Sequence, residues 1–303
     1  MAIKELSILI PTYNDRCVTL VSSLRQQAEA LGIVYEILVA DDGSDDSAVV
    51  SYNETINQWE HCRYLVQPVN QGRAAIRNVL AREARFDTLL FLDSDTMITN
   101  DRFLARYLQI GAEPVVVGGI TIEGDPVILR HNLRYRYEKA EEQHHTAAMR
   151  QHSPYQHIRT TNLLIRHEVM LQHPFDERFR YYGYEDVLLG KVLRQAQVPI
   201  VHIDNPIGFC TFESNPNFVA KTEESLRTLH QFRADLRGYS RLLTFVGGIH
   251  IPAILALIRL WHRLFGKAEK WNLCGPHPSL FIFKLYRLGY FLSLRQHNKK
   301  SAS

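Results

Sequence analysis

The chain has 303 residues, enough for one large domain or for a domain with an appendage, and 46% of them are apolar, which is enough for a normal core. Its net charge of +3 conceals an asymmetry, because residues 1–215 hold 21 Lys and Arg against 28 Asp and Glu, whereas residues 216–303 hold 14 against 4. An acidic body with a basic C-terminal region suggests an anionic partner such as nucleic acid or a membrane, while four scattered cysteines without a Cys-x-x-Cys pair argue against a zinc site or a disulfide framework.

The first hundred residues alternate between apolar runs and helical patterns. Four runs are predicted to be strands: residues 6–10, 35–40, 63–67 and 89–92. Three segments between them are predicted to be helices: residues 18–31, 46–57 and 72–85. Unbroken apolar strands that alternate with helices are typical of a parallel sheet covered on both faces. We therefore predict the nucleotide-binding half of a doubly wound α/β domain over residues 1–100, with no signal peptide before it.

Residues 101–215 are predicted to complete this domain. Strands are expected at residues 114–121, 162–166 and 200–203. A helix is expected at residues 184–195, opened by two acids that suit the positive end of its dipole. Residues 129–157 are rich in Arg, Tyr, His and Glu and are expected to form helix and flexible loop.

The C-terminal region, residues 216–303, is predicted to be a helical extension. Helical patterns cover residues 218–236, 242–258 and 279–294. The segment 242–258 is apolar but short for a membrane span, and it contains Gly247, Gly248, His250 and Pro252. An amphipathic helix in the interface of an anionic membrane is therefore favoured, and helices that pack on the preceding domain are the alternative.

The most informative motif is the pair of carboxylates, Asp93 and Asp95, that directly follows the apolar run 89–92. Open α/β sheets bind their ligands at the carboxyl ends of strands, and residues two apart on a strand share a face. Both carboxylates could then approach one divalent cation, which would bind a diphosphate. The pair predicts a nucleotide-diphosphate substrate, and a solvated Asp-Ser-Asp turn is the simpler alternative.

Polar residues also follow the first two predicted strands and begin the third predicted helix. Asp41 and Asp42 could accept hydrogen bonds from a base or a ribose, although residues 42–44 also suit a helix cap. Arg73 and Arg77 lie four residues apart on one helix face and could reach the base or the phosphates. The alternative is a solvated helix face with Glu83 as the partner.

The order of these motifs resembles glycosyltransferase family 2, the inverting nucleotide-sugar enzymes of the GT-A fold. The resemblance covers about residues 5–205 and rests on six elements: Ile10-Pro11-Thr12-Tyr13-Asn14, Asp41-Asp42-Gly43-Ser44, Asn70-Gln71-Gly72 followed by Ile76-Arg77-Asn78, Asp93-Ser94-Asp95, Thr160-Thr161-Asn162 and Gly183-Tyr184-Glu185-Asp186. It implies a GT-A domain over residues 1–215, with a nucleotide-binding half (1–100) and an acceptor half (101–215).

The resemblance also implies roles for individual residues. The nucleotide would be bound by Pro11, Thr12, Tyr13, Asn14, Asp41, Asp42, Arg73, Arg77 and Asp93. Asp95 would hold Mn²⁺ or Mg²⁺ directly, and Asp93 would contact the ribose or a metal-bound water. Asp186 would be the catalytic base, Glu185 would orient a sugar, and Thr161, Asn162 and Gly183 would lie near the donor or acceptor sugar. His202 is a further candidate metal ligand, but Phe209 stands where many relatives place a second histidine.

We therefore expect a cytoplasmic enzyme, peripheral on the inner face of the membrane. It would move a sugar from a UDP- or GDP-sugar to a glycan or lipid-linked acceptor in surface polysaccharide synthesis, and no nucleic-acid partner is expected. Three alternatives stay open: a sugar nucleotidyltransferase, which should carry a Gly-rich basic loop where this chain has residues 11–13; a carboxylate-pair glycoside hydrolase; and a non-catalytic scaffold.

Overall fold

The computed structural model describes residues 3–111 and 113–294 and divides them into two compact units. The first unit runs to Asp125 and resumes over Glu138–Thr211. The second consists of Pro126–Tyr137 and the chain from Phe212 onward. The charge boundary near residue 215 gave no indication that residues 126–137 belong with the C-terminal region.

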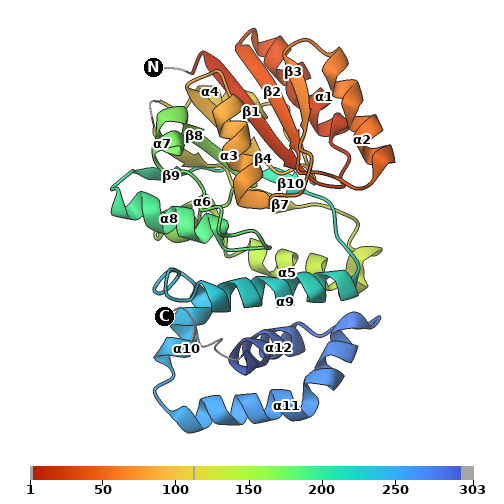
Figure 1. Cartoon of the computed structure of the whole chain (residues 1–303), viewed down its shortest axis with the longest axis vertical. Helices are drawn as coiled ribbons and strands as arrows, with labels where there is room; N and C mark the ends of the chain where they lie inside the picture. The colour runs from red at the N-terminus through yellow and green to blue at the C-terminus, as the bar shows by residue number, and fades with distance from the viewer. Residues whose placement is uncertain (1–2, 112, 295–303) are drawn as a thin grey trace, which may run out of the picture. The chain divides into compact units, whose positions relative to one another are not determined.

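The first unit is built on a seven-stranded sheet in the order β3-β2-β1-β4-β8-β6-β9 (Figure 1). Its strands are β1 (Glu5–Thr12), β2 (Val34–Asp41), β3 (Cys62–Val66), β4 (Thr88–Leu92), β6 (Val115–Val117), β8 (Asn162–Arg166) and β9 (Ile200–His202). Strand β8 is antiparallel to both of its neighbours, and all other adjacent pairs are parallel. The predicted mostly parallel, doubly wound sheet is confirmed.

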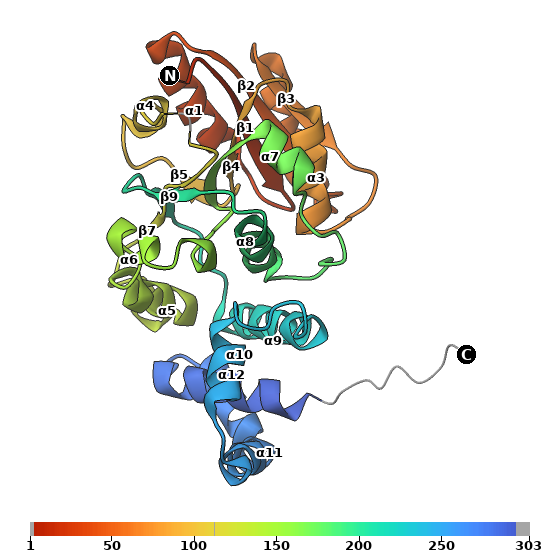
Figure 2. The same cartoon turned by 90° about the vertical axis from the view of Figure 1, so that its left-hand side faces the viewer.

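Helices cover both faces of this sheet, as Figure 2 shows for α1 and α4 on one face and α3 and α7 on the other. The helices of the unit are α1 (Val18–Leu31), α2 (Ser47–Glu54), α3 (Arg73–Glu83), α4 (Phe103–Leu108), α6 (Ala147–Gln151), α7 (His167–Gln172) and α8 (Glu185–Gln195), with 3₁₀ turns at Thr55–Gln58 and Pro154–Gln156. Alternate residues of β1, Leu6, Ile8 and Ile10, are buried in one core with Leu20 and Leu24 of α1. Period-two strands and period-3.6 helices thus bury their apolar faces against each other.

The predicted single strand at residues 114–121 is wrong, because the chain leaves the main sheet after β6. It forms β7 (Ile120–Ile122), which joins β5 (Thr96–Met97) and β10 (Ile207–Phe209) in a second sheet of order β5-β10-β7. The break lies at Gly118 and Gly119. A Cβ on Gly118 would lie 2.2 Å from the hydroxyl of Tyr107, and Gly119 has φ +88. Only glycine fits both the close approach and the left-handed backbone.

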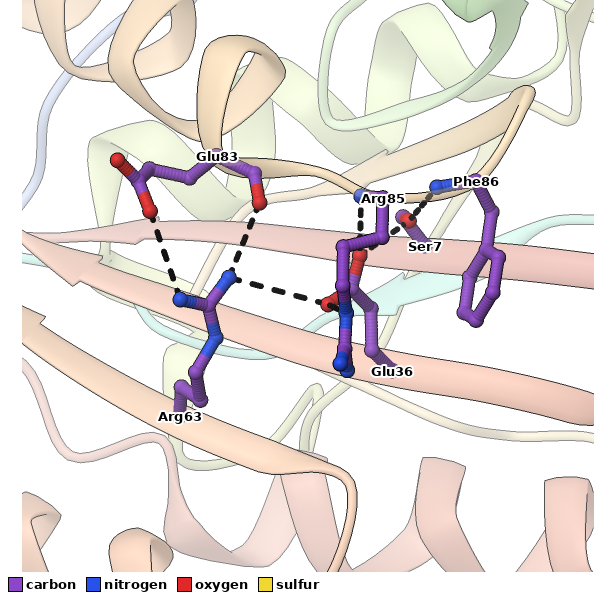
Figure 3. Close-up of polar contacts among 6 residues, drawn as sticks. All are labelled: Ser7, Glu36, Arg63, Glu83, Arg85 and Phe86. Carbon is purple, nitrogen blue, oxygen red and sulfur yellow. Dashed lines mark hydrogen bonds and ion pairs between the residues drawn. The ribbon is translucent and has the colours of Figure 1, made fainter.

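A buried carboxylate ties the amino ends of β1, β2 and β4 together (Figure 3). Glu36 has no solvent exposure and accepts hydrogen bonds from Ser7 Oγ at 2.7 Å and from the Arg85 backbone N–H at 2.6 Å. The Arg85 guanidinium lies 2.8 Å from the second oxygen of Glu36, and Arg63 lies 3.8 Å from it. The Phe86 backbone N–H donates to Ser7 Oγ, so the turn into β4 is fixed at this edge of the sheet.

The second unit is helical. It contains part of α5 (Leu133–Glu142) and the helices α9 (Asn215–Gln231), α10 (Arg241–Gly248), α11 (Pro252–Cys274) and α12 (Leu280–Ser293), with a 3₁₀ turn at Leu129–His131. Its core consists of six buried side chains: Leu133, Phe218, Val219, Leu273, Phe283 and Tyr286. Residues 129–157, predicted only as helix and loop, thus contribute α5 and α6 and supply Leu133 to this core.

The predicted helix over residues 242–258 is two helices. Helix α10 ends at Gly248, and α11 begins at Pro252, which has no N–H to leave unsatisfied in a first turn. Helix α11 then continues to Cys274, well beyond the predicted end. Across the residues that the structure describes, no helix combines the length and apolar character needed to cross a membrane.

Candidate active site

The two carboxylates of the Asp-Ser-Asp motif lie on a turn and not on a strand. Strand β4 ends at Leu92, and the hydroxyl of Thr96 donates to the Asp93 carbonyl at 2.7 Å, closing the turn into β5. The expectation that Asp93 and Asp95 share one strand face is therefore wrong, although both remain at the carboxyl end of β4 as predicted. The carbonyl of Asp95 accepts a weak bond from Cys210 Sγ at 3.7 Å.

Arg77 is the centre of the site. This side chain is 2% exposed, and its two terminal nitrogens reach Asp93 Oδ1 at 2.7 Å and Glu185 Oε1 at 3.1 Å. Its Nε atom is buried without a hydrogen-bond partner. A guanidinium is a rigid fork of donors, so one residue of α3 fixes the distance between the end of β4 and the start of α8.

Asp93 is held as a carboxylate. Burial opposes its ionisation, but the charges of Arg77 and Arg73 and a hydrogen bond from Thr161 Oγ1 at 2.7 Å hold the pKa of Asp93 below its usual range. Both oxygens of Asp93 are therefore engaged, one by Arg77 and one by Thr161. The site keeps a negative charge at this position throughout the neutral pH range.

The first turns of α3 also hold the segment before α8. Arg73 lies over the ring of Tyr182, 4.6 Å from its centroid. Gly72 has φ +94, and a Cβ there would lie 2.6 Å from the carbonyl oxygen of Arg180. One turn further, the Asn78 amide accepts from the Phe175 N–H and donates to the Phe175 carbonyl, each at 2.9 Å. Position 72 must be glycine, because its backbone and that of Arg180 approach too closely for a side chain.

Helix α8 begins with the two predicted acids after an unusual turn. Gly183 and Tyr184 both have positive φ, +96 and +73, and the conformation at Tyr184 is strained for a residue with a side chain. Glu185 is buried against Arg77. Burial, reinforced by the charge of Glu185, raises the pKa of Asp186 to about 7, although Arg159 and Arg77 oppose this shift. Asp186 is thus a carboxylate that can take up a proton near neutral pH.

The loops after β1 and β2 are joined by Asn14. Its amide nitrogen donates to Asp45 Oδ1, its oxygen accepts from the N–H groups of Asp45 and Asp46, and its backbone N–H donates to Ser44 Oγ. Of the other predicted residues in the first loop, Thr12 is buried and Tyr13 is exposed. The structure thus brings the Pro11–Asn14 segment and the loop after Asp42 together at the ends of the neighbouring strands β1 and β2.

The two carboxylates at the end of β2 already serve the fold. Asp41 is fully buried, accepts from the Ser44 N–H at 2.6 Å and bonds the hydroxyl of Tyr64. Asp42 accepts from the N–H groups of Gln71 and Gly72 at 2.8 and 2.9 Å, and burial raises its pKa. A contact with a nucleotide would therefore use a remaining lone pair of either carboxylate.

Two other predicted residues have their polar atoms engaged within the fold. Asn162 is 1% exposed, accepts from the Tyr107 hydroxyl at 2.6 Å and donates to the carbonyls of Gly119 and Asn205 at 2.8 Å. His202 is buried, with Nδ1 3.1 Å from Arg150 Nε and Nε2 2.9 Å from the Pro154 carbonyl. Burial lowers the pKa of His202, and Arg150 adds to the effect, so the ring is neutral and both nitrogens have partners.

The donor set was tested for a divalent metal. Across the described residues, no three or more His, Cys, Asp or Glu side chains form a group that could hold one. Mg²⁺ is commonly held by one or two carboxylates together with the phosphates of a substrate, and Asp95 could meet that smaller requirement, because both oxygens of Asp93 already bond Arg77 and Thr161. The residues present therefore fit an ion that arrives with a diphosphate and do not form a complete metal site of their own.

Three contacts near the site were not predicted. The charge of Arg159 lowers the pKa of Asp186, the ring of Tyr182 stacks on Arg73, and Arg150 donates a hydrogen bond to His202. No pattern in the sequence marks Arg159 or Arg150. The bonds between Asn78 and Phe175 are a further contact that was not predicted, although Asn78 directly follows Arg77 in the motif Ile76-Arg77-Asn78.

Comparisons with solved structures agree with this fold. S. aureus TarS, residues 1–349, has a TM-score of 0.51 at 16% identity, with 95% of this chain and 90% of that chain covered. The mannosyltransferase PcManGT from Pyrobaculum calidifontis also has a TM-score of 0.51, at 13% identity, with 95% and 84% covered. At such low identity the likeness concerns the fold alone.

Relatives in sequence point the same way. An uncharacterized glycosyltransferase from Haemophilus influenzae is 27% identical over 233 residues, 71% of each chain. A second from the same organism is 35% identical over 100 residues, 32% of this chain and 38% of that relative. The poly(ribitol-phosphate) beta-glucosyltransferase of Bacillus spizizenii is 33% identical over 106 residues, which cover only 17% of its length.

The sheet, its edge of acids and arginines, and these relatives together define a glycosyltransferase of the GT-A fold. The profile of Glycosyl transferase family 2 matches residues 7–171, more than half of the chain. The protein belongs to this family. The nucleotidyltransferase, glycoside hydrolase and scaffold alternatives are therefore not retained.

Proposed function

We propose that the protein is an inverting glycosyltransferase that moves one sugar from a UDP- or GDP-sugar to a glycan or lipid-linked acceptor in surface polysaccharide synthesis. The observation that carries the proposal is the joining of Asp93 to Glu185 through Arg77, next to an aspartate with a pKa of about 7. Two similar proteins support the substrate class: a poly(ribitol-phosphate) beta-glucosyltransferase and a mannosyltransferase in complex with GDP-Man and Mn²⁺.

Asp186 is the proposed base. In an inverting transfer, the acceptor oxygen attacks the anomeric carbon while the bond to the diphosphate breaks on the opposite face of the sugar. The acceptor hydroxyl proton passes to the Asp186 carboxylate, and the electron pair of the broken bond stays on the diphosphate. A carboxyl that titrates at about 7 is well matched to this step, because catalysis by a general base is most effective when its pKa lies near the working pH.

Glu185 is the proposed sugar-orienting residue. Its contact with Arg77 fixes one carboxylate oxygen, and its position at the first turn of α8 holds it beside Asp186. Gly183 lies two residues before this pair at a positive φ, and its backbone is the proposed neighbour of the sugar. Thr161 is the proposed neighbour of the donor sugar through its bond to Asp93, whereas Asn162 is left out because its amide is fully used inside the fold.

The nucleotide is proposed to lie over the ends of β1 and β2. Tyr13 is exposed there, and Pro11, Asp41 and Asp42 lie close by at the same edge. Arg73 is exposed at the start of α3 and is proposed to meet the phosphates. The ring of Tyr182 holds this guanidinium in place.

A Mn²⁺ or Mg²⁺ ion is proposed to accompany the diphosphate. When bound, it would neutralise the charge that develops on the leaving group. Asp95 is the proposed direct ligand, because both oxygens of Asp93 are committed to Arg77 and Thr161. His202 is left out, because Arg150 and Pro154 engage both of its nitrogens. The reaction is proposed to occur in the cytoplasm, with the basic C-terminal region at the inner face of the membrane.

Kinetics and product analysis of Asp186→Asn test the mechanism. The variant keeps shape and hydrogen bonding but cannot take up the proton, so kcat should fall by about 10²–10⁴ while donor affinity stays within about twofold. Donor affinity is measured by titration calorimetry with UDP- and GDP-sugars. Asp176→Asn is the control and should behave like the wild type, because this half-buried carboxylate is paired with the exposed Arg178 and not with a residue of the proposed site. The wild-type product should have inverted anomeric configuration by NMR, and a retained configuration would refute the mechanism.

A further inference from the structure

Helix α11 presents an apolar face to solvent. Seven large apolar side chains on it are exposed, here called the outer apolar face: Ile254, Leu257, Leu260, Trp261, Leu264, Phe265 and Trp271. Trp271 is 80% exposed, and Leu257 and Leu264 are 66% and 65% exposed. Most of these residues recur at spacings of three, four or seven, so they form one continuous stripe along the helix. A surface helix normally turns such a stripe inward.

The opposite side of α11 holds the helix in this orientation. Helix α11 packs on α12 and α9, and α12 lies between the other two in both views (Figures 1 and 2). Glu269 is buried on this side and accepts from Trp261 Nε1 at 2.8 Å and pairs with His262 Nδ1 at 3.0 Å. A Cβ on Gly289 of α12 would lie 2.7 Å from His262 Cβ. Because turning the outer apolar face inward would break this polar cluster and the close glycine contact, the stripe stays outside.

Positive charge follows one border of the stripe. Three side chains, here called the basic row, are exposed beside it: Arg259, Arg263 and Lys267. They are spaced four residues apart, so they share a second face of the helix, whereas Lys270 is paired with Glu223 of α9 at 2.7 Å. The single acidic residue of α11 is the buried Glu269. The exposed surface of this helix is therefore apolar and cationic only.

These features select the kind of partner. An exposed apolar stripe that includes tryptophan, beside a row of Arg and Lys, is the pattern of a helix that lies in a membrane interface. Long basic side chains can lie along the apolar surface while their charged ends reach phosphate groups. A second copy of the chain would fit less well, because it would bring its own basic row against the first.

We propose that α11 binds the surface of an anionic bilayer, with the outer apolar face at the acyl boundary and the basic row on lipid phosphates. Helix α10, none of whose residues is buried, precedes α11 and contains the exposed Phe245, and the exposed Ile251 lies at the N-cap of α11. This inference rests on the proposed location of the enzyme at the membrane and names α11 as the surface that binds the lipid.

Vesicle sedimentation tests the outer apolar face. The full chain should sediment with phosphatidylcholine vesicles that contain phosphatidylglycerol, and only weakly with phosphatidylcholine alone. Leu257→Gln with Leu264→Gln should lower binding by about 10- to 100-fold, because two side chains lose their place in hydrocarbon. Leu171→Gln is the matched control, since Leu171 is also helical and 53% exposed but belongs to α7. Equal binding of the double variant and the control would refute the proposal.

The basic row is tested by charge and salt. Arg263→Gln with Lys267→Gln should weaken binding about fivefold for each charge lost, and added NaCl should weaken wild-type binding by screening. Lys4→Gln with Arg102→Gln removes the same charge from exposed positions elsewhere and should have a smaller effect. An equal effect of both pairs would show that net charge alone drives binding, and would contradict a defined lipid-binding face.

A tryptophan reporter separates membrane contact from self-association. The chain has three tryptophans, so Trp59→Phe with Trp261→Phe leaves Trp271 as the only one, and Glu269 keeps its pair with His262 in this variant. Its emission should shift to shorter wavelength on anionic vesicles and be quenched by brominated lipid chains. A blue shift that depends on protein concentration without lipid would instead assign the face to a second copy. Nucleotide-sugar binding by the same variants is measured in parallel, so failure of lipid binding and failure of the proposed transfer are told apart.

Discussion

Asp186 is the residue whose chemistry depends most on its surroundings. Removal from water and the charge of Glu185 both disfavour its carboxylate and raise its pKa to about 7, while Arg159 and Arg77 limit the shift. The neighbouring Asp93 experiences the opposite balance, because Arg77 and Arg73 overcome its burial and lower its pKa. Two carboxylates in one cluster are thus assigned different states at neutral pH by their charged neighbours.

This difference predicts a pH dependence. Because the pKa of Asp186 is raised, the proton-accepting form is lost below about pH 7, and kcat/KM should fall about tenfold per pH unit on the acidic side. Glu185→Gln removes a negative charge beside Asp186 and should move this limb to lower pH. The measurement is a pH–rate profile for the wild type, Glu185→Gln and the control Asp176→Asn. If the acidic limb of Glu185→Gln lies at the same pH as that of the wild type, the charge of Glu185 does not raise the pKa of Asp186.

At the level of residues, the sequence predicted which side chains gather at the site better than how they are used. Adjacent strand ends and the spacing of Arg73 and Arg77 were enough to bring acids and arginines to one edge. The bond from Arg77 to Glu185 spans 108 positions of the chain, and no local pattern encodes it. Asn162 and His202 show the same limit, because their partners come from distant loops that the sequence alone does not place.

Among the elements, α3 does the most to assemble the site. Its Arg77 bridges two carboxylates, and Asn78, the next residue, holds the segment that leads toward α8. The helix thus connects parts of the chain that otherwise meet only at the site. Its outer face is different, because Arg82 is 58% exposed and lies 3.9 Å from Glu177.

Two substitutions on this helix should therefore differ sharply. Arg77→Met leaves Asp93 and Glu185 without their shared cation and should lower the free energy of unfolding by about 3–5 kcal/mol, with a large loss of kcat. Arg82→Met removes an exposed ion pair and should change stability by at most about 1 kcal/mol. Urea denaturation of both variants measures the contrast. Similar losses of unfolding free energy for the two variants would mean that Arg77 does not stabilise the cluster of Asp93 and Glu185.

The regular elements followed from the sequence where the local signals agreed. Strands β1 to β4 and helices α1, α3 and α8 were predicted because the apolar periodicity and the length of each segment point the same way. The strand at residues 114–121 failed because its apolar pattern hides Gly118 and Gly119, whose role depends on Tyr107 and Arg150. Helix α11 was missed as a unit because the predicted segment followed the apolar run 242–258, which crosses the break before Pro252 and stops at Arg259, whereas the helix continues to Cys274.

On the scale of the molecule, the second unit is assembled from two separate parts of the chain. Leu133 lies in Pro126–Tyr137, and its core partners come from α9, α11 and α12. Truncation after Ser240 removes Leu273, Phe283 and Tyr286 from this core. Since burial of each large apolar side chain contributes about 1.5–3 kcal/mol, the shortened protein should lose at least about 5 kcal/mol of stability in this unit.

Calorimetric melting and light scattering measure this loss. The truncated protein should aggregate or melt well below the full chain, whereas Leu257→Gln with Leu264→Gln should melt like the wild type, because both leucines are exposed. The C-terminal helices would then contribute through their inner faces to folding and through α11 to lipid binding. A truncated protein that keeps the wild-type melting temperature would contradict the shared core.

The two-part construction of the second unit also fixes an order of events during synthesis. Leu133 leaves the ribosome long before Phe218, and longer still before Leu273 and Phe283, which bury it. At a translation rate of roughly 5–20 residues per second, about 8–30 s pass between the synthesis of Leu133 and that of Phe283. The catalytic sheet has by then been synthesised in full, while the apolar start of α5 still waits for its partners. The nascent chain therefore passes through a period in which the sheet of the first unit has been synthesised in full, while Leu133 of the second unit still lacks its core partners.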